Sequence, residues 1–378
     1  MSAPIGRVVV VGNGIAGLTA AHQLRECGFD GELTVVGDEP YPAYSRPALS
    51  KALLLDGVDR SAHELAPATH GAVELLGVRA RGLDAERRLV TLDDGVVLPY
   101  DGLVIATGAR ARRLSGLPEE HTLRGLDDAL ALRERLAGRP SVVVAGGGPL
   151  GMEIASACLA AGCAVTLVSQ GVPLAGHLGP YLAEVFVKAA LDRGLTIAET
   201  GAGRIERGAG GVRVVLEDGA VVEAELLVSA AGDVPNTEWL AGAGLAAGGV
   251  VRVDGRGLAR PGVAAVGDLA AFPTPYGLRR VPLWNSAIEQ AKVAAAALVR
   301  GDEAPPLRFQ PYFWTEQFGL SLKAAGYLPV RGEPEYVEGE PGGPGLMRWS
   351  REGGSGTAVA LNHRVPIPRL RRVSRAAA

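Results

Sequence analysis

The first 40 residues combine a short apolar run, closely spaced glycines and a helical repeat of apolar positions. Residues 7–11, RVVVV, are β-branched and apolar, as in a strand that is buried on both faces. GNGIAG at 12–17 follows directly, and the next residues have helical periodicity as far as Gly28. A second apolar run with an acidic end, ELTVVGDE at 32–39, predicts the next strand. The chain therefore begins with a predicted strand–turn–helix–strand unit.

The glycines of this turn have the G-x-G-x-x-G spacing that is typical of dinucleotide-binding proteins. Gly12 permits the tight turn, Gly14 lets the backbone approach a pyrophosphate, and Gly17 lets the helix pack closely on the strand. The phosphates then face the amide groups at the positive end of the helix. Asp38, after the second strand, is placed to accept hydrogen bonds from a ribose. We therefore predict a dinucleotide site here rather than a glycine-rich packing turn.

The same pattern recurs at 141–170, SVVVAGGGPLGMEIASACLAAGCAVTLVSQ. Gly146, Gly148 and Gly151 match the three glycine roles. The second strand ends at Ser169, and this stretch has neither an acid for a ribose 2′-hydroxyl nor an arginine for a 2′-phosphate. Two such units predict two nucleotides, in particular a flavin that receives hydride from a nicotinamide, or one duplicated fold with one site lost. The choice between NADH and NADPH stays open, as does a weakened nicotinamide site.

Composition narrows the class of protein. The chain has 378 residues, 47% hydrophobic and 21% charged, which is typical of a globular protein of two to three domains. A net charge of −3 argues against a nucleic-acid binder or a polybasic membrane protein, and no apolar run reaches the roughly 18 residues of a membrane span. Three cysteines are too few for a disulfide framework, so we expect a reducing, cytoplasmic setting. The six histidines are scattered and none pairs with cysteine at zinc spacing, so we predict no metal site.

A series of stretches, in one order along nearly the whole chain, resembles a known family. After the first glycine loop come YSRPALSK (44–51) and YDGLVIATGA (100–109). The second glycine loop follows, and then VRVDGRGLARPGVAAVGDLA (251–270) and PYFWTEQFGL (311–320). Together they are similar to the putidaredoxin reductase-like ferredoxin reductases of bacterial dioxygenase and haem monooxygenase chains, which are flavoproteins of the glutathione reductase-type fold.

The resemblance implies an α/β fold with two Rossmann-like domains and a C-terminal α+β domain. We expect an FAD-binding domain over 1–110 and 236–310, an NAD(P)H-binding domain over 111–235 and a C-terminal interface domain over 311–378. The implied reaction passes electrons from NADH or NADPH through FAD to a ferredoxin-type iron–sulfur protein that serves an oxygenase. The implied protein is a monomer or homodimer without nucleic-acid or membrane partners.

The resemblance also assigns roles to single positions. Lys51, the only lysine in the first 187 residues, matches a lysine near flavin N5, where a cation favours electron density on the ring. Glu153 matches an acid beside the nicotinamide, although any carboxylate in a first helical turn is also stabilised by the helix dipole. Trp314 matches a position near the flavin face, and its ordinary alternative is a core aromatic residue. Further FAD contacts are implied at Ala16, Arg46, Ala80, Thr107, Gly108, Arg133, Gly267, Asp268 and Trp284, whereas Gly232 and Asn236 match a loop that crosses the second nucleotide site.

Disulfide-reducing members of this fold carry a C-x4-C pair beside the flavin. The matching stretch of this chain, PAYSRPALSK, contains no cysteine. Cys158 and Cys163 have that spacing, but they straddle a helix end and are interpreted as packing residues. Without a thiol relay, electrons leave the flavin for a one-electron carrier, dioxygen or a small organic acceptor. Two alternatives therefore stay open: an FAD-dependent oxidase or monooxygenase-like enzyme with its own organic substrate, and an FAD-binding redox sensor.

The basic stretch PIPRLRRVSR near the C-terminus is either a docking patch for an acidic ferredoxin or a solvated tail.

Overall fold

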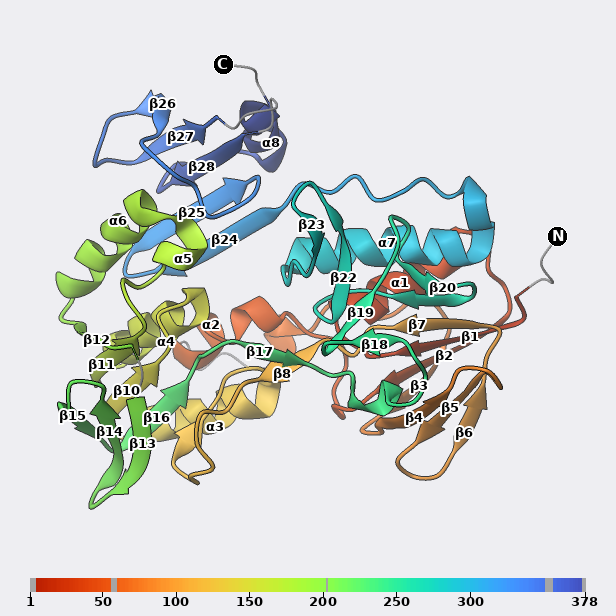
Figure 1. Ribbon diagram of the computed structural model, residues 1–378, viewed down its shortest axis with the longest axis horizontal. Coiled ribbons are helices and arrows are strands. Elements are labelled where there is room, and N and C mark those ends of the chain that lie inside the picture. Colours follow the sequence, from red (N-terminus) through yellow and green to blue (C-terminus); the bar gives the residue numbers. More distant parts are fainter. Residues whose placement is uncertain (1–4, 56–59, 202, 351–355, 376–378) are drawn as a thin grey trace. The chain divides into compact units, whose positions relative to one another are not determined.

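The computed structural model describes residues 5–55, 60–201, 203–350 and 356–375 (Figure 1). The chain forms two compact units, each assembled from three separate segments. The first unit contains Met1–Ser45, Ser61–Arg110 and Val234–Phe309, and the second contains Arg46–Arg60, Ala111–Asp233 and Gln310–Ala378.

The centre of the first unit is a six-stranded sheet with the order β20-β21-β7-β1-β2-β3. Strand β1 pairs in parallel with both β2 and β7, and β21 pairs in parallel with β7. Val8 and Val10 enter one apolar cluster, whereas Val9 and Val11 enter another, so β1 is buried on both faces as predicted. The strands are β1 Arg7–Val11, β2 Glu32–Gly37, β3 Val73–Leu76, β7 Gly102–Ile105, β20 Leu258–Arg260 and β21 Val263–Ala265.

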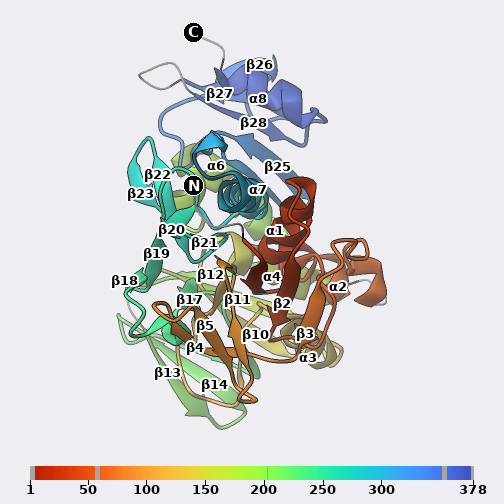
Figure 2. The same ribbon diagram turned by 90° about the vertical axis from the view of Figure 1, so that its right-hand side faces the viewer.

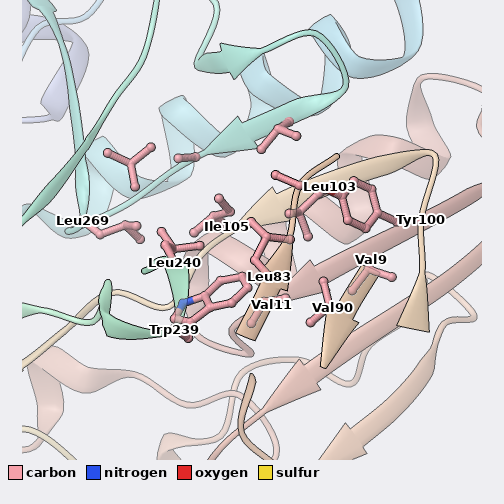
Figure 3. Packing of buried hydrophobic residues seen from close by; sticks show 14 of the residues in the cluster. Val9, Val11, Leu83, Val90, Tyr100, Leu103, Ile105, Trp239, Leu240 and Leu269 are labelled. Atoms are coloured by element: carbon pink, nitrogen blue, oxygen red, sulfur yellow. The ribbon is translucent and has the colours of Figure 1, made fainter. Parts of the chain in front are cut away.

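Helices cover one face of this sheet and smaller sheets cover the other. Helices α1 (Ile15–Glu26) and α7 (Trp284–Arg300) pack against each other over one cluster (Figure 2). The opposite cluster includes Trp239 and Leu240 beside Val9, Val11 and Leu83 (Figure 3). It is completed by β4 Ala80–Asp84, β5 Leu89–Leu92, β6 Val97–Pro99, η3 Glu238–Leu240, β18 Ala246–Ala247, β19 Val250–Arg252, β22 Ala270–Thr274 and β23 Gly277–Arg279.

The second unit repeats the strand–glycine loop–helix pattern in a parallel sheet with the order β12-β11-β10-β16-β9. Helix α4 begins at Pro149 directly after the second glycine loop, where a missing amide hydrogen costs nothing. The sheet consists of β9 Glu120–His121, β10 Ser141–Ala145, β11 Ala164–Ser169, β12 Thr196–Glu199 and β16 Leu226–Ser229. It is joined by α2 Ala52–Leu55, α3 Leu126–Leu136, α4 Pro149–Ala160, α5 Ala175–Leu178, α6 Pro180–Leu191, β13 Gly203–Gly208, β14 Gly211–Leu216 and β15 Val221–Ala224.

An antiparallel five-stranded sheet completes the second unit, with the order β24-β25-β28-β27-β26. Helix α8 (Ile367–Arg375) packs on it and buries Leu370 completely. The strands are β24 Tyr312–Gln317, β25 Leu320–Ala325, β26 Glu335–Gly339, β27 Gly345–Trp349 and β28 Thr357–Leu361. The predicted α/β class is confirmed, with two strand–glycine loop–helix units and a C-terminal sheet that carries a helix. Among the described residues, no helix has the length and apolar character needed to cross a membrane.

Candidate nucleotide sites and a buried ion pair

The first glycine loop joins the end of β1 to the start of α1. Gly12 has a φ of +117°, and a methyl group there would overlap the carbonyl oxygen of Ala106. A methyl group on Gly17 would overlap the carbonyl oxygen of Gly12. At Gly14, by contrast, no described heavy atom lies within 4 Å of the place that a Cβ would take. Backbone packing therefore requires the first and third glycines, whereas the second faces open space that a diphosphate fits.

Two other predicted stretches end beside this loop, because β1, β7 and β21 are parallel neighbours. The close approach of Ala106 to Gly12 brings the following Thr107–Gly108 turn to the loop. A methyl group on Gly267 would lie 3.3 Å from Cβ of Ala16, so Asp268 also follows β21 into this region. The structure therefore gathers three predicted segments at the carboxyl ends of parallel strands, where such sheets bind ligands.

Thr107 and Asn236 are joined by reciprocal hydrogen bonds in the first unit. Thr107 Oγ1 donates to the carbonyl oxygen of Asn236 (2.7 Å), and Asn236 Nδ2 donates to the carbonyl oxygen of Thr107 (2.9 Å). The amide of Asn236 also donates to the carbonyl oxygen of Gly108 (2.9 Å). Asn236 is thereby held at the Thr107–Gly108 turn, whereas Gly232 lies in the second unit, where its carbonyl oxygen accepts the amide of Arg112 (3.0 Å).

The remaining positions assigned to the first unit lie at the starts or ends of its elements. Asp38 follows β2, and its carboxylate lies 3.8 Å from Nε of Arg79, with both side chains more than half exposed. An exposed pair of this kind leaves the carboxylate accessible to a ribose. Trp284 is the first residue of α7, and Ala80 is the first residue of β4.

The second glycine loop repeats the backbone packing of the first. A methyl group on Gly146 would overlap the carbonyl oxygen of Ala230, and one on Gly151 would overlap that of Gly146. Ser169 is buried at the end of β11, and its hydroxyl occupies the place that a Cβ on Gly147 would take. Backbone packing therefore requires the first and third glycines of this loop as well, and a neutral hydroxyl lies at the end of its second strand.

Glu153 is the fifth residue of α4, so the expectation that it lies in the first helical turn is wrong. In the second unit, its carboxylate accepts three side-chain hydrogen bonds. Its Oε2 accepts from Ser50 Oγ (2.5 Å) and from Lys51 Nζ (2.7 Å), and its Oε1 accepts from Thr315 Oγ1 (2.6 Å). Gln317 Nε2 donates to Thr315 Oγ1 (2.9 Å) and continues the chain of bonds along β24. Glu153 is only 8% exposed, so a buried carboxylate here forms an ion pair with the partly exposed ammonium group of Lys51.

The pleat of β24 decides which of its side chains reach Glu153. Successive side chains point to opposite faces of a strand, so Thr315 and Gln317 share one face and Tyr312 and Trp314 share the other. The rings of Tyr312 and Trp314 stack with centroids 5.8 Å apart, and Trp314 is half-buried against the C-terminal apolar cluster. Trp314 therefore lies on the opposite face of β24 from the bonds to Glu153.

The two arginines that the resemblance assigned to FAD lie in the second unit. Arg46 Nη1 donates to the carbonyl oxygen of Arg124 (2.8 Å), and Arg133 Nη1 donates to the carbonyl oxygen of Leu53 (3.5 Å). Arg46 and Leu53 flank Lys51 in the sequence, so these bonds join the segment around Lys51 to the backbone of Arg124 and to the side chain of Arg133.

Sequence reasoning missed three members of the Glu153 cluster: Ser50, Thr315 and Gln317. Ser50 precedes Lys51, and the other two lie within FWTEQ, so each stood in a stretch that had already been singled out. The sequence did not show that these side chains come together around the carboxylate of Glu153. Gln290 on α7 was also missed, and its Oε1 accepts the amide of Gly267 (3.0 Å) beside Asp268.

The two cysteines with C-x4-C spacing are free and buried. Burial, together with the neighbouring Cys163, raises the pKa of the Cys158 thiol to about 12. A thiol of this kind stays protonated at neutral pH, and the protonated form is a poor nucleophile. This agrees with their interpretation as packing residues. Within the described ranges, no three His, Cys, Asp or Glu residues are grouped to hold a metal ion.

Known proteins share this organisation over most of the chain. The family model described as pyridine nucleotide-disulphide oxidoreductase matches residues 6–296. Rhodocoxin reductase from Rhodococcus erythropolis is 36% identical over 347 residues, which are 88% of this chain and 80% of that protein. The ferredoxin–NAD(+) reductase component of the p-cumate 2,3-dioxygenase system of Pseudomonas putida is 34% identical and covers 86% of this chain and 82% of its own.

A solved structure agrees with these sequence matches. In the crystal structure of the covalent putidaredoxin reductase–putidaredoxin complex, one chain matches with a TM-score of 0.88 and 28% identity. The match covers 99% of this chain and 94% of that one. The extent of the family match and the identity to these relatives show that the chain belongs to the pyridine nucleotide-disulphide oxidoreductase family.

Proposed function

We propose that this protein is a flavoprotein reductase that passes electrons from NADH or NADPH through FAD to a ferredoxin-type iron–sulfur protein of an oxygenase system. The observation that carries the proposal is the repeated strand–glycine loop–helix unit, which provides for two nucleotides in one chain. The names of the relatives supply the acceptor, because they are reductases of rhodocoxin or of dioxygenase ferredoxins. The buried, protonated Cys158 supports direct transfer without a thiol relay.

The first unit has the features that FAD binding needs. The open space at Gly14 accepts the diphosphate, Asp38 is accessible for the ribose, and Asp268 follows β21 beside the same loop. The Thr107–Gly108 turn is fixed there by Asn236. Bound FAD supplies hydride acceptance and the release of single electrons. The protein supplies position and electrostatic field.

Lys51 and Glu153 set the charge around the proposed reaction. Lys51 is held by Glu153 and by the carbonyl oxygen of Pro47 (3.2 Å), so its ammonium group has a defined position. A fixed cation favours negative charge arriving on a flavin, and Glu153 positions that cation. Trp314 is proposed to line the route by which electrons leave. The second glycine loop, with Gly146, Gly148, Gly151 and Ser169, is proposed to hold NADH or NADPH.

Rapid mixing under anaerobic conditions tests this function. The purified yellow protein is mixed with NADH or NADPH, the flavin absorbance is followed, and an oxidised ferredoxin is then added. We expect bleaching by at least one nucleotide and reoxidation by the ferredoxin. Flavin that stays oxidised with both nucleotides would contradict the proposal and favour the oxidase alternative, in which a small organic substrate reduces the flavin.

Substitution of Lys51 tests the proposed role of its charge. We expect Lys51→Met to slow flavin reduction by about 10²-fold, because it removes a positioned charge, and Lys51→Arg to retain most of the rate. The observed rate constant for bleaching and the FAD content are the measurements. Lys188→Met is the matched control, because Lys188 is exposed on α6. An unchanged rate and an unchanged FAD content in Lys51→Met would remove Lys51 from the mechanism.

A further inference from the structure

The two glycine loops differ at their second glycine. Gly14 faces open space, but a methyl group on Gly148 would lie 3.4 Å from Cε1, 3.8 Å from Nε2 and 3.9 Å from Nδ1 of His177. An imidazole ring therefore stands beside the one glycine of the second loop whose role is to let backbone approach a diphosphate. Both loops share the packing of their first and third glycines, so the ring beside the second glycine distinguishes the second loop from the first.

The segment after β11 is built to bring His177 to this place. The amide of Leu174, a residue with a φ of +66°, donates to the carbonyl oxygen of Gly147 (2.8 Å). Helix α5 begins at the next residue, and the amide of His177 donates to the carbonyl oxygen of Leu174 (2.9 Å). The backbone of His177 is therefore anchored by hydrogen bonds that start on the glycine loop itself.

The imidazole is available to a ligand. Its ring nitrogens make no hydrogen bond to the described part of the chain, and His177 is exposed to solvent. Partial burial lowers the pKa of His177, and no charged group of the described residues contributes to that shift. The elements around the ring are the glycine loop, α5 and the start of α4, whose first turn has no acid. The acid on α4 is Glu153, and its oxygens are taken by Ser50, Lys51 and Thr315.

We propose that His177 is a diphosphate-binding residue of the second nucleotide site, whose protonated ring donates a hydrogen bond to a phosphate oxygen of the nicotinamide dinucleotide. This inference rests on the proposed function and adds to it a residue that the glycine motif does not contain. Strand β11 ends in the neutral Ser169, so this site has no acid to bind the ribose. The contact with His177 therefore supplies a larger share of the binding free energy than it would in a site with such an acid.

The proposal implies that binding of the dinucleotide depends on pH. The diphosphate of NAD⁺ keeps its negative charge between pH 5.5 and 8.5, so only the ring changes its charge in this contact. An anion stabilises the imidazolium and raises the pKa of His177 in the complex above its value in the free protein. The affinity therefore rises as the pH falls below the bound-state pKa, and it levels off below the lowered pKa of the free protein. Binding in this range takes up a proton.

Calorimetric titration of the FAD-loaded protein with NAD⁺ at pH 8.5 and 5.5 tests this. We expect the wild type to bind about tenfold more tightly at pH 5.5, which is the size of a charge-assisted hydrogen bond. His177→Gln should bind equally at both pH values, and His177→Arg should bind tightly at both. His22→Gln is the matched control, because its imidazole lies in the first unit, and it should behave like the wild type. Adenosine, which lacks the diphosphate, should show none of the pH effect.

The outcomes separate this inference from the proposed function. Equal pH dependence in the wild type and His177→Gln would overturn the inference while NADH-driven flavin reduction stands. Tighter binding by His177→Gln at every pH would also overturn it, because the ring would then be an obstacle. If NAD⁺ and NADP⁺ bind at neither pH and neither reduced nucleotide bleaches the flavin, both the inference and the proposed function are lost. Proton uptake measured in buffers of different ionisation enthalpy should disappear only in the His177 variants.

Discussion

A carboxylate removed from water is costly unless its oxygens are bonded, and Glu153 meets this requirement with three donors. One donor, Lys51, carries a charge, and the other two are the hydroxyls of Ser50 and Thr315. Thr315 in turn accepts from Gln317, so its hydroxyl hydrogen is directed at Glu153. At the scale of single residues, the position of Lys51 therefore depends on Glu153 and on two hydroxyls that bond to it, one from the adjacent Ser50 and one from the distant Thr315.

Removal of the Thr315 hydroxyl tests this dependence. Thr315→Val keeps the shape of the side chain but leaves one oxygen of Glu153 and one amide hydrogen of Gln317 without their partner. We expect it to lower the free energy of unfolding by about 1–3 kcal/mol, because a bond to a buried charged group is lost. Urea unfolding followed by circular dichroism measures the change. Thr315→Ser retains the hydroxyl and is the control, so equal unfolding midpoints for the two variants would contradict the assignment.

At the scale of elements, each glycine loop joins a parallel strand to the first turn of a helix. The third glycine of each loop meets the carbonyl oxygen of the first, so its hydrogen is required by packing within the element. The second glycine of the first loop has a φ of −85°, which any L-residue adopts, and it faces open space. The reasons for the three glycines are therefore different: packing requires the first and the third, whereas the second leaves open space for the proposed ligand.

This difference predicts opposite effects of two alanine substitutions in the first loop. Gly17→Ala should destabilise the protein by about 3 kcal/mol, because the new methyl group overlaps backbone that cannot move freely. Gly14→Ala should leave the unfolding of the FAD-free protein unchanged but weaken FAD binding by about 1–3 kcal/mol. Thermal unfolding and fluorescence titration with FAD measure the two effects. Normal FAD affinity in Gly14→Ala would show that the diphosphate does not lie against this glycine.

Most of the basic stretch near the C-terminus folds as helix α8. From its sequence, this stretch was interpreted as a docking patch or a solvated tail. Leu370 and Ser374 are buried and Val373 packs against the C-terminal cluster, whereas Arg372 remains exposed. The spacing of the apolar positions is helical, so this signal was present in the sequence. The arginines on α8 are therefore held on a folded surface.

At the scale of the whole molecule, the chain reuses one strand–glycine loop–helix design without the thiol pair found in disulfide-reducing relatives of the fold. Cys158 and Cys163 are buried, and Cys27 is partly exposed. Burial raises the pKa of Cys163 as well as that of Cys158. Neither buried thiol ionises appreciably at neutral pH, so the protein has no described cysteine pair poised for redox exchange.

Thiol chemistry on the folded protein tests this arrangement. At pH 7.5 we expect a disulfide reagent to modify at most Cys27 in the native protein and all three cysteines in urea. The reaction of Cys158 should increase only as the pH approaches its raised pKa of about 12, because the thiolate is the reactive form. The double variant Cys158→Ala/Cys163→Ala should keep the wild-type rate of NADH-driven ferredoxin reduction. A loss of electron transfer in that variant, with normal FAD content, would reveal a redox role.

The sequence by itself determined the two strand–glycine loop–helix units, the packing roles of their first and third glycines and the class of fold. These features follow from local rules: apolar periodicity decides between strand and helix, and glycine spacing marks places where a side chain would overlap neighbouring backbone. Only the tertiary structure decided that Ser50, Lys51 and Thr315 meet on Glu153, that Trp314 points to the other face of β24, and that His177 stands beside Gly148. These contacts join segments that lie tens to hundreds of positions apart in the sequence. They depend on how strands and helices pack, and no local pattern of residues encodes that packing.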